Sequence, residues 1–442
     1  MMQTVLVLAL WSAAVTWTLL LMVVLALRRF RHAPRPTDAD PMEEPEDAPL
    51  VSILVPARNE EHRILRQSLA SMLAQNYPAI EVIVVNDRST DRTLEILREV
   101  AESDSRLRVI DGEEPPPGWR GKPFALQQAL AHARGEWILS IDADILLDPE
   151  TVRKALALAR KYRCDALSLL PRMDYVSFWD HVIEPQALNL LRLGMLIGSV
   201  KARLRWACEG GATHAPAAHA DHKKQGISFN PLFFLSAYVG DQAFTIGAFT
   251  LVRRRALDAI GGYAAIRSEV MDETILGIRL HQQGFRVFAV EGTHLIHTPA
   301  RVAFSELWEA YSRVICPAVG RNPLVLMASV ATAAILTLLP VGVLIATFLG
   351  MIPTDRDMAA VIGSAALGYL AMVAVGAILA EEDRQPGIYH LASFVGFAVF
   401  IAIALSSVWR RYKQRDVIWK GRPVFLQGMA EPGQIAQHER QG

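Results

Sequence analysis

The chain has 442 residues, with 45 basic and 45 acidic side chains and three cysteines. This length suffices for one large domain or for two to three ordinary ones. A formal net charge of zero gives no indication of nucleic acid or of another strongly charged partner. The isolated cysteines Cys164, Cys208 and Cys316 have no ligand-like spacing, and an odd count argues against a disulfide framework. The mean hydropathy of +0.22 is high for a soluble protein, and the apolar residues are clustered.

The first cluster is an N-terminal apolar run from Val5 to Leu27, which the basic residues "RRFRH" follow directly. About 20 apolar residues suffice to cross a bilayer. No small-residue cleavage site follows, so residues 1–32 are predicted to form a transmembrane anchor rather than a signal peptide. The basic cluster predicts that the chain continues on the cytoplasmic side. Residues 33–49 are rich in proline and acidic residues and are predicted to form a linker.

Further apolar segments occupy residues 323–410 and are predicted to be transmembrane. The uncharged stretches are Pro323–Thr354, Met358–Ala380 and Ile388–Trp409. With the anchor they make four crossings, which would place the basic tail, residues 411–442, outside, against the positive-inside rule. Either one stretch is re-entrant or interfacial, or this cytoplasmic-type tail breaks the rule.

Between these regions, residues 50–300 alternate strand and helix patterns. The short apolar runs "LVSILVP", "EVIVV", "RLRVI" and "EWILSI" are typical of buried parallel strands. Segments with helical spacing of apolar residues follow them, such as "STDRTLEILREVAE" and "DPETVRKALALARKY". The pattern predicts an α/β, Rossmann-like domain with a mostly parallel sheet. In such sheets ligands bind at the carboxyl ends of the strands.

Polar residues follow three of these strands. The first strand ends in "PARNE" (56–60), the second in "NDRS" (86–89) and the fourth in Asp142-Ala143-Asp144. Asp142 and Asp144 share a face if strand geometry continues to Asp144. Paired carboxylates suit Mg²⁺ or Mn²⁺, which prefer oxygen ligands and bridge to substrate phosphates. If the chain turns earlier, binding of one of the two to ribose or water instead of the metal is an alternative.

Four blocks carry a resemblance to a known family. In chain order they are "VSILVPARNE", "VIVVNDRSTDRT", "GWRGKPFALQQALAHARGEWILSIDAD" and "EVMDETILGIRLHQQGFRV". They resemble the successive blocks of family 2 glycosyltransferases with the GT-A fold, the fold of nucleotide-diphospho-sugar transferases. The "GWRGK" block and the late "WKGRPV" (419–424) resemble the membrane-bound branch that includes hopanoid-associated, carotenoid and ceramide glycosyltransferases.

The resemblance implies roles for residues at the strand ends. Pro56, Arg58 and Glu60 would lie at the nucleotide pocket, and Asp87 would recognise the base, typically uracil. Asn86 stands where the family often has a second Asp, which leaves Asp87 in place. Lys122 would approach the donor diphosphate; its alternative is a solvated lysine at a helix start. Asp142 and Asp144 would hold Mg²⁺ or Mn²⁺ on that diphosphate.

The expected chemistry also needs a base for the acceptor hydroxyl. The candidates are Asp272 and Glu273 in "MDETILGIRL". The family usually has Glu-Asp or Asp-Asp with the second acid as base, which maps onto Glu273. Here the order is Asp-Glu, so the choice between the two stays open, with Glu273 preferred. The alternative is that both acids only complement the helix dipole.

The predicted function is therefore an inverting transfer of one sugar from a nucleotide-sugar donor, with UDP as the expected nucleotide, to a lipid or lipid-like acceptor. The expected location is a bacterial-type inner or plasma membrane, with the catalytic domain facing the cytoplasm. A processive polysaccharide synthase is one alternative, but no Gln-x-x-Arg-Trp block follows Glu273. A non-catalytic nucleotide- or lipid-binding protein of the same fold is another, and the retained acidic residues argue against it.

Other features are less specific. The segment "HAPAAHADHKK" (214–224) contains metal-type residues, but its alanines and proline favour a loop. His294 and His297 follow a strand; His297 is a minor candidate for a metal ligand, and a structural histidine is the default. Residues 178–200 and 302–319 are amphipathic, and a helix at 301–322 is predicted to lie in the membrane interface, with packing against the sheet as the alternative.

Overall fold

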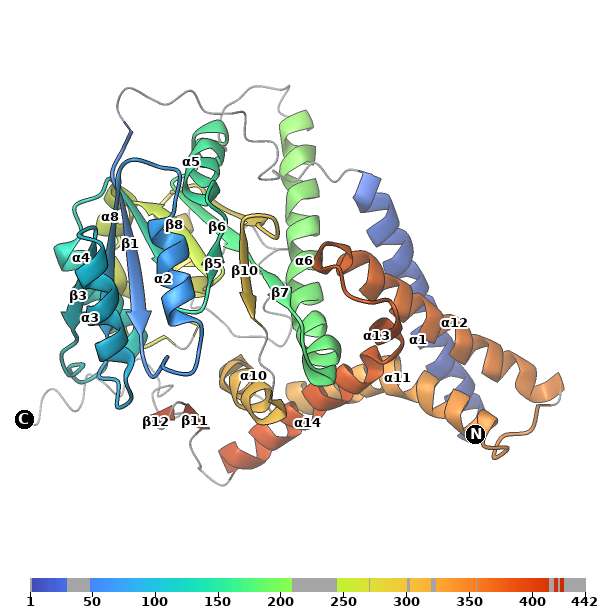
Figure 1. Cartoon of the computed structure of the whole chain (residues 1–442). Coiled ribbons are helices and arrows are strands. Elements are labelled where there is room, and N and C mark those ends of the chain that lie inside the picture. The colour runs from blue at the N-terminus through green and yellow to red at the C-terminus, as the bar shows by residue number, and fades with distance from the viewer. Residues whose placement is uncertain are drawn as a thin grey trace, which may run out of the picture.

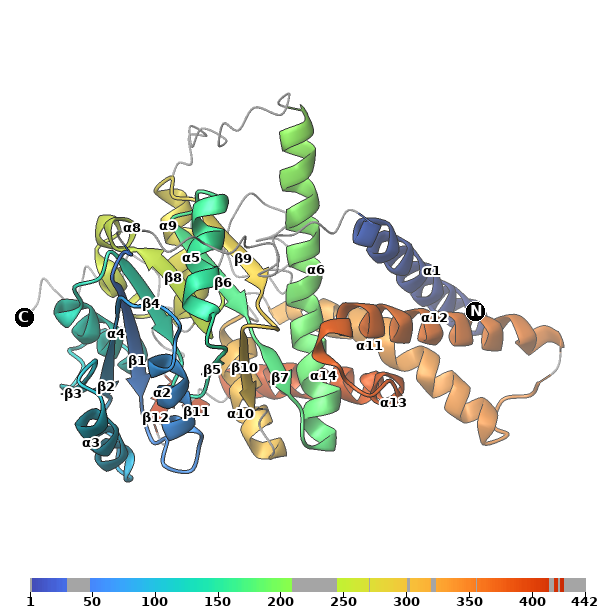
Figure 2. The same ribbon diagram turned by 45° about the horizontal axis from the view of Figure 1, so that its top comes forward.

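The computed structural model describes residues 2–29, 48–208, 245–269, 271–299, 303–318, 323–354, 356–412, 417–419 and 422–424. A sheet with helices on both faces makes up one side of the molecule, and a group of long apolar helices makes up the other (Figure 1). The long helix α6 (Phe178–Cys208) stands between these two parts (Figure 2).

The main sheet has seven strands in the order β3-β2-β1-β4-β8-β6-β9. They are β1 Val51–Ala57, β2 Ile80–Asn86, β3 Leu107–Asp111, β4 Trp137–Ile141, β6 Ala166–Leu170, β8 Phe249–Arg253 and β9 Val287–Glu291. Neighbouring strands are parallel except where β8 pairs antiparallel with β4 and β6. The predicted α/β class with a mostly parallel sheet is confirmed.

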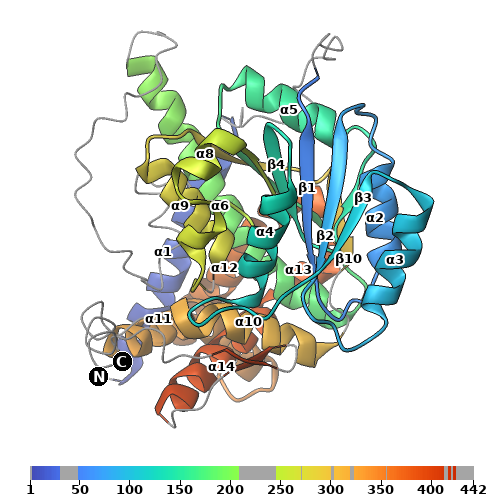
Figure 3. The same cartoon turned by 90° about the vertical axis from the view of Figure 1, so that its left-hand side faces the viewer.

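Helices cover both faces of this sheet, as Figure 3 shows for α4 on one face and α2 and α3 on the other. The first face carries α2 Leu65–Leu73, α3 Thr93–Ser103 and α5 Thr151–Lys161. The opposite face carries α4 Gly121–His132, α8 Arg254–Ala259, the 3₁₀ helix η2 Gly262–Ile266 and α9 Asp272–Gln282. The crossovers through α2, α3 and α5 thus run over one face of the sheet, and the crossover through α4 runs over the other.

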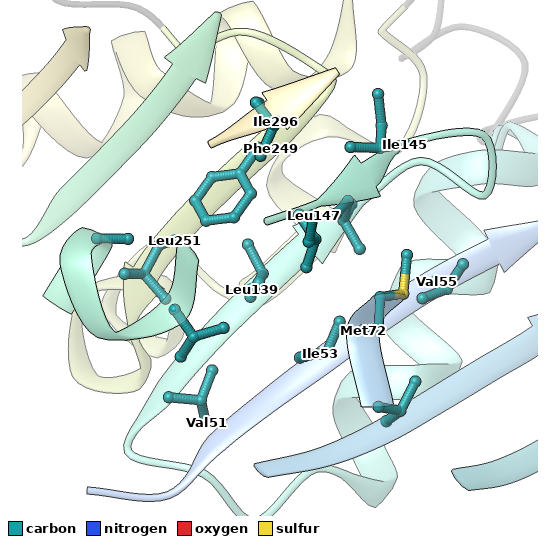
Figure 4. Close-up of a cluster of buried hydrophobic side chains, with 14 of the residues drawn as sticks. Val51, Ile53, Val55, Met72, Leu139, Ile145, Leu147, Phe249, Leu251 and Ile296 are labelled. Atoms are coloured by element: carbon teal, nitrogen blue, oxygen red, sulfur yellow. The ribbon is translucent and has the colours of Figure 1, made fainter. Parts of the chain in front are cut away.

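Strand alternation divides the core between the two faces. Val51, Ile53 and Val55 of β1 face α2, α3 and α5, and are fully buried there with Met72 (Figure 4). Leu54, between them in sequence, faces α4 on the other side. A strand buried on both faces must be apolar throughout, which explains the continuous apolar runs in the sequence.

A second, three-stranded sheet lies at the carboxyl end of β4. It consists of β5 (Leu146–Leu147), β10 (Ile296–Pro299) and β7 (Arg172–Asp174), in that order. The antiparallel register places His297 opposite Leu146. Thr298 Oγ1 donates a hydrogen bond to the carbonyl oxygen of Asp144 at 2.9 Å. This small sheet therefore fixes the turn that carries Asp144.

Three helices in the described part of the chain are long and apolar enough to cross a membrane: Thr4–Leu27 in α1 (Met2–Arg29), Met327–Phe348 in α11 (Pro323–Phe348) and Met358–Leu379 in α12 (Arg356–Leu379). The fourth predicted stretch is broken into α13 (Ile388–Leu391) and α14 (Ser393–Tyr412). Only Ser393–Ser407 of it forms an apolar helix, shorter than the other three.

Small residues bring α1 and α12 close together. Ala13 and Ala14 of α1 are fully buried, and a Cβ added at Gly368 of α12 would come within 3.3 Å of the Ala14 backbone. Trp17 also donates a hydrogen bond from Nε1 to the Leu336 carbonyl of α11 at 2.9 Å. Small residues at helix contacts are typical of packing within membranes.

The apolar helices are joined firmly to the sheet domain through α6. At Gly396 of α14, an added Cβ would lie 1.9 Å from the Val182 carbonyl of α6, so only glycine fits there. Arg192 of α6 donates hydrogen bonds to both carboxylate oxygens of Asp383, at 2.7 Å and 2.5 Å. Asp383 lies in the 3₁₀ helix η3 (Glu381–Asp383), and both side chains are almost fully buried. Tyr175 adds a third hydrogen bond to Asp383 at 3.1 Å.

Removing one partner of this buried ion pair is expected to loosen the attachment of the apolar helices. Arg192→Met leaves the Asp383 carboxylate buried without its main partner, which costs about 3 to 5 kcal/mol. Thermal unfolding of the detergent-solubilised protein measures the loss. The double variant Arg192→Met/Asp383→Leu removes both charges and is expected to recover most of the stability. A double variant as unstable as the single one would contradict this interpretation.

Candidate active site

Strand β4 ends at Ile141, before the two predicted metal-binding carboxylates. Asp142, Ala143 and Asp144 lie in a turn, which the hydrogen bond from Ile145 N to Asp142 O closes at 3.3 Å. The two carboxylates therefore do not share a strand face, and the alternative of an early turn is the one observed. Each carboxylate meets a different cationic side chain.

Lys122 joins Asp142 to Glu273. Its Nζ donates a hydrogen bond to Asp142 Oδ1 at 2.6 Å and also contacts Glu273 Oε1. Lys122 lies in the first turn of α4, and Glu273 in the first turn of α9. The lysine side chain is 31% exposed and that of Asp142 is 37% exposed, whereas that of Glu273 is 8% exposed. A ligand from solvent can thus reach Asp142 and Lys122, with Glu273 below them.

Negative charge exceeds positive charge around this lysine. Burial lowers the pKa of Lys122, but Asp142, Glu273 and Asp272 together raise it well above its usual range. Burial, followed by the neighbouring Asp272 carboxylate, raises the pKa of Glu273 as well, against the opposing effect of Lys122. One ammonium group cannot neutralise three carboxylates, so the cluster favours a proton or a further cation.

Arg63 holds the second carboxylate of the turn. Its guanidinium donates a hydrogen bond to Asp144 Oδ2 at 3.1 Å. The same side chain lies 3.7 Å from a carboxylate oxygen of Glu60 and 3.6 Å from one of Glu306, at the start of α10 (Phe304–Ala318). Three acids from three segments thus meet at one arginine. Arg63 is not among the residues predicted from the sequence, because no local pattern distinguishes it from a surface arginine.

The predicted base-recognition residue, Asp87, lies at the end of β2 between two arginines. Arg58 donates a hydrogen bond to the Asp87 carbonyl at 2.9 Å, and Arg88 donates one to the carboxylate oxygen Oδ1 at 3.2 Å. Pro56, opposite Val85 in the β1–β2 register, lies on the same sheet edge. The structure therefore brings Pro56, Arg58 and Asp87 together, as the strand pattern predicts.

The loops after β1 and β2 are locked together by Asn59. Its backbone N–H donates to Ser89 Oγ at 3.1 Å, and its side-chain oxygen accepts from the Thr90 N–H at 2.9 Å. Asn59 and Arg88 both have positive φ angles, 51° and 52°, which are uncommon for residues other than glycine. Strained backbone of this kind persists where the surrounding contacts hold it, and it clusters at functional sites.

Two residues before β8 position Glu273, and the sequence analysis did not identify them. Thr245 donates a hydrogen bond from Oγ1 to the Glu273 carbonyl. A Cβ added at Gly247 would lie 3.0 Å from Glu273 Oε2, so the carboxylate packs directly on this glycine. A glycine just ahead of a strand was the only available signal. Asp272 is buried beside Glu273 and accepts a hydrogen bond from the Glu273 N–H at 3.1 Å.

The histidine candidates have different outcomes. His297 Nδ1 lies 2.6 Å from Asp174 Oδ2, an arrangement consistent with a structural histidine. His294 is exposed. The segment 214–224, with His214, His219, Asp221 and His222, lies outside the described residues.

The turn residues suit a divalent cation only together with a ligand. Within the described ranges no group of three or more His, Cys, Asp or Glu side chains forms a complete metal site. Asp142 and Asp144 are each paired with a cationic side chain, which shows that this turn stabilises positive charge. Mg²⁺ and its analogues are often held by only one or two carboxylates and complete their coordination with phosphate oxygens and water. The carboxylates present therefore fit a cation that arrives with a diphosphate.

Comparison with solved structures identifies the fold as GT-A. The mannosyltransferase PcManGT from Pyrobaculum calidifontis, solved with GDP-Man and Mn²⁺, superposes with a TM-score of 0.50 and 20% identity, over 91% of this chain and 99% of its own. The GT-A fold predicted from the sequence blocks is confirmed.

Sequence comparison finds two regions of similarity to glycosyltransferases. Residues 52–185 match the sequence model of Glycosyl transferase family 2, and residues 211–428 match that of Glycosyl transferase family 21. The predicted resemblance to family 2 glycosyltransferases, and with it the predicted enzyme class, is confirmed.

Two curated relatives illustrate the similarity. Probable glycosyltransferase YdaM of Bacillus subtilis is 39% identical over 104 residues, 23% of this chain and 24% of its own length. The 4,4'-diaponeurosporenoate glycosyltransferase of Staphylococcus haemolyticus is 30% identical over 145 residues, 32% of this chain and 37% of its own length. The chain thus matches well under half of the length of either relative.

Substituting Gly247 is expected to disturb Glu273 selectively. In Gly247→Ala the new methyl group would press on the Glu273 carboxylate, and displacements of this kind reduce turnover by roughly tenfold to a hundredfold. Steady-state sugar transfer is the measurement, with kcat expected to fall and donor affinity to stay the same. Gly387→Ala, where an added Cβ meets nothing within 4 Å, is the matched control. Equal activity of the two variants would contradict the role of Gly247.

Proposed function

We propose that this protein is a membrane-bound, inverting glycosyltransferase that transfers one sugar from a nucleotide-sugar donor to a lipid or lipid-like acceptor. The observation that carries the proposal is the contact of Lys122 with both Asp142 and Glu273. It joins the carboxylate turn expected at the donor diphosphate to the acid expected to activate the acceptor. A uridine nucleotide is the proposed donor nucleotide, with Asp87 at the base.

The donor would lie along the carboxyl ends of β1, β2 and β4. Pro56, Arg58 and Asp87 would line the nucleoside, and Lys122 would pair with the diphosphate. Asp142 and Asp144 would hold Mg²⁺ or Mn²⁺ on that diphosphate, and PcManGT, which was solved with GDP-Man and Mn²⁺, supports a divalent cation. When bound, the cation would stabilise the negative charge of the leaving nucleoside diphosphate as a Lewis acid.

Glu273 is the proposed general base. Its buried carboxylate, with a raised pKa, can accept the proton of an acceptor hydroxyl more readily than an exposed glutamate. The donor diphosphate would compete with Glu273 for Lys122 and so withdraw the ammonium group from the base. The negative charge of Asp272, packed beside Glu273, would favour the protonated form of Glu273 and so help it to take the proton. Asp272 remains the alternative base.

The surroundings of the site support an apolar acceptor. Glu306, near the start of α10, contacts Arg63, and the helix also packs on α14 and α6. The ring centroids of Phe304 in α10 and Trp179 lie 4.7 Å apart, and Val176 and Phe178, close to Trp179 in the sequence, have exposed side chains. Tryptophan is enriched at membrane interfaces, which fits the position of Trp179. The curated name of the diaponeurosporenoate relative also describes a lipid-like acceptor.

A topology with three crossings fits both charge and contacts. If α1, α11 and α12 cross the membrane and α14 lies at the interface, the sheet domain and the basic tail share one side. Both then satisfy the positive-inside rule, which favours the cytoplasm for that side. The burial of Asp383, in η3 directly after α12, against Arg192 of α6 supports the same arrangement. We propose an inner or plasma membrane location with the catalytic domain in the cytoplasm.

Lipid analysis tests the proposed function. Mass spectrometry of lipids from cells with and without the protein is expected to reveal a lipid that gains the mass of one hexose-type sugar. A ladder of products would favour a processive synthase. If the purified protein with Mg²⁺ or Mn²⁺ neither hydrolyses nor transfers from any nucleotide sugar in a panel, a non-catalytic binding protein becomes the better reading.

Glu273→Gln is expected to keep donor binding and lose transfer, because glutamine cannot accept the proton. The loss of a general base corresponds to roughly a hundredfold to ten-thousandfold in kcat. Donor affinity by calorimetry and transfer by product assay separate the two effects. Glu102→Gln, at an exposed site on α3, is the control. Full activity of Glu273→Gln would move the base to Asp272.

Asp144→Ala is expected to abolish the metal-dependent part of donor binding. The substitution removes a proposed cation ligand and leaves Arg63 with Glu60 and Glu306. Calorimetric titration of donor with Mn²⁺ and with EDTA measures this part directly. Asp258→Ala, at an exposed position on α8, should retain it. Retention by Asp144→Ala would assign Asp144 to ribose or water.

A further inference from the structure

A cavity rich in arginine lies at the amino-terminal edge of the parallel strands, away from the candidate active site. Its volume is about 410 Å³. We call it the arginine cavity; it is lined by Arg160, Arg163, Arg253, Arg255 and Arg286, with Cys164 and Asp165. Neither the sequence motifs nor the proposed transfer reaction uses any of these residues.

Sheet register explains why the arginines converge. Ala166 at the start of β6 pairs with Val252 of β8 on one side and with Val287 of β9 on the other. Arg253 and Arg286 therefore flank Asp165 across three adjacent strands. The Arg253 N–H donates to the Asp165 carbonyl, and the Asp165 N–H donates to the Arg286 carbonyl, both at 2.8 Å.

The end of α5 supplies two further arginines to the same cavity. Arg160 lies in its last turn. Arg163 follows with a φ of 48°, and its N–H donates to the Arg160 carbonyl at 3.0 Å. The chain then enters β6 through Cys164 and Asp165. The end of α5, the end of β8, the start of α8 and the residue before β9 thus bring five guanidinium groups together.

Positive charge exceeds negative charge in this cavity. Asp165 accepts hydrogen bonds from Arg255 at 2.8 Å and from the Arg286 N–H at 3.2 Å. Arg253 lies 3.2 Å from Glu136 and stacks over Trp137. Among the side chains that line the cavity, one carboxylate, that of Asp165, stands beside five arginines. Burial raises the pKa of Cys164 to about 12, so its thiol adds no negative charge.

This surplus is local, because the whole chain has no net charge. A surface exposed only to water would gain nothing from gathering like charges, which repel one another. Guanidinium groups match phosphate oxygens in charge and geometry. Several of them around one cavity favour an anion that offers several phosphate oxygens. The volume falls within the range of small-ligand sites.

We propose that the arginine cavity binds a phosphate-bearing anion. It is separate from the donor site: β4 runs from Trp137, opposite Arg253, to Ile141 before the carboxylate turn, a span of about 13 Å. A soluble polyphosphate or nucleotide and an anionic phospholipid headgroup share this chemistry. The proposal does not depend on the transfer reaction.

Calorimetric titration with inorganic pyrophosphate tests the proposal. The full chain is placed in phosphatidylcholine nanodiscs with EDTA, which suppresses metal-dependent binding at Asp142 and Asp144. The wild type is expected to bind saturably, and Arg160→Gln/Arg163→Gln to bind at least tenfold more weakly. Both arginines are exposed, so the fold should tolerate the change, and a thermal melt verifies this.

The matched control is Arg98→Gln/Arg108→Gln, which removes the same charge from exposed positions on α3 and β3. Its affinity should stay within twofold of the wild type. Absence of saturable binding, or equal weakening in both double variants, would overturn the proposal.

A second arm of the same titration distinguishes the two sources of phosphate. Phosphatidylglycerol is added to the nanodiscs, and the titration of the wild type is repeated. A weaker apparent affinity for pyrophosphate, absent from the Arg160→Gln/Arg163→Gln variant, identifies a lipid headgroup as the occupant. An unchanged affinity identifies a soluble phosphate. Weakening of equal size in both proteins would contradict a headgroup in the cavity.

Discussion

The candidate site depends on the placement of too much negative charge around one lysine. Carboxylates at the end of β4 and at the start of α9 converge on Lys122, which is the cation that contacts both groups. A buried excess of carboxylate raises the free energy of the empty site, and a proton or a cation lowers it. A ligand that carries a divalent cation would therefore find a site already adapted to positive charge, with Glu273, the proposed proton acceptor, beside Lys122.

Ion pairs also connect the sheet domain, which carries this site, to the apolar helices. Arg63 joins the Asp144 carboxylate to Glu306 at the start of α10, and Arg192 joins α6 to Asp383 in η3, directly after α12. The close contact at Gly396 adds a steric constraint between α14 and α6. The end of the sheet that carries Asp142 and Asp144 is thus held at a fixed position relative to the helices that we propose lie in and on the membrane.

Local patterns in the sequence predict much of this structure, since they report what each segment buries. Continuous apolar runs predict strands such as β1, and polar residues at their ends predict the sheet edge that carries Asp87 and Asp142. Contacts between segments that are distant in the sequence produce no such local pattern. The bridging position of Lys122 and the packing of Gly247 on Glu273 depend on how α4, α9 and β8 meet.

Two further structural features could not be predicted from local sequence patterns. Uncharged composition alone does not reveal that the stretch from Ile388 to Trp409 breaks between α13 and α14. Spacing alone does not reveal that β4 ends before Asp142, because the turn is fixed by Thr298 from a distant strand.

The most direct test of the account is electron–nuclear double resonance on Mn²⁺ bound to the purified protein with uridine diphosphate. The account predicts a ³¹P hyperfine coupling from a protein-bound Mn²⁺–diphosphate complex. Mn²⁺ that remains free in solution, or that binds without ³¹P coupling, would contradict it.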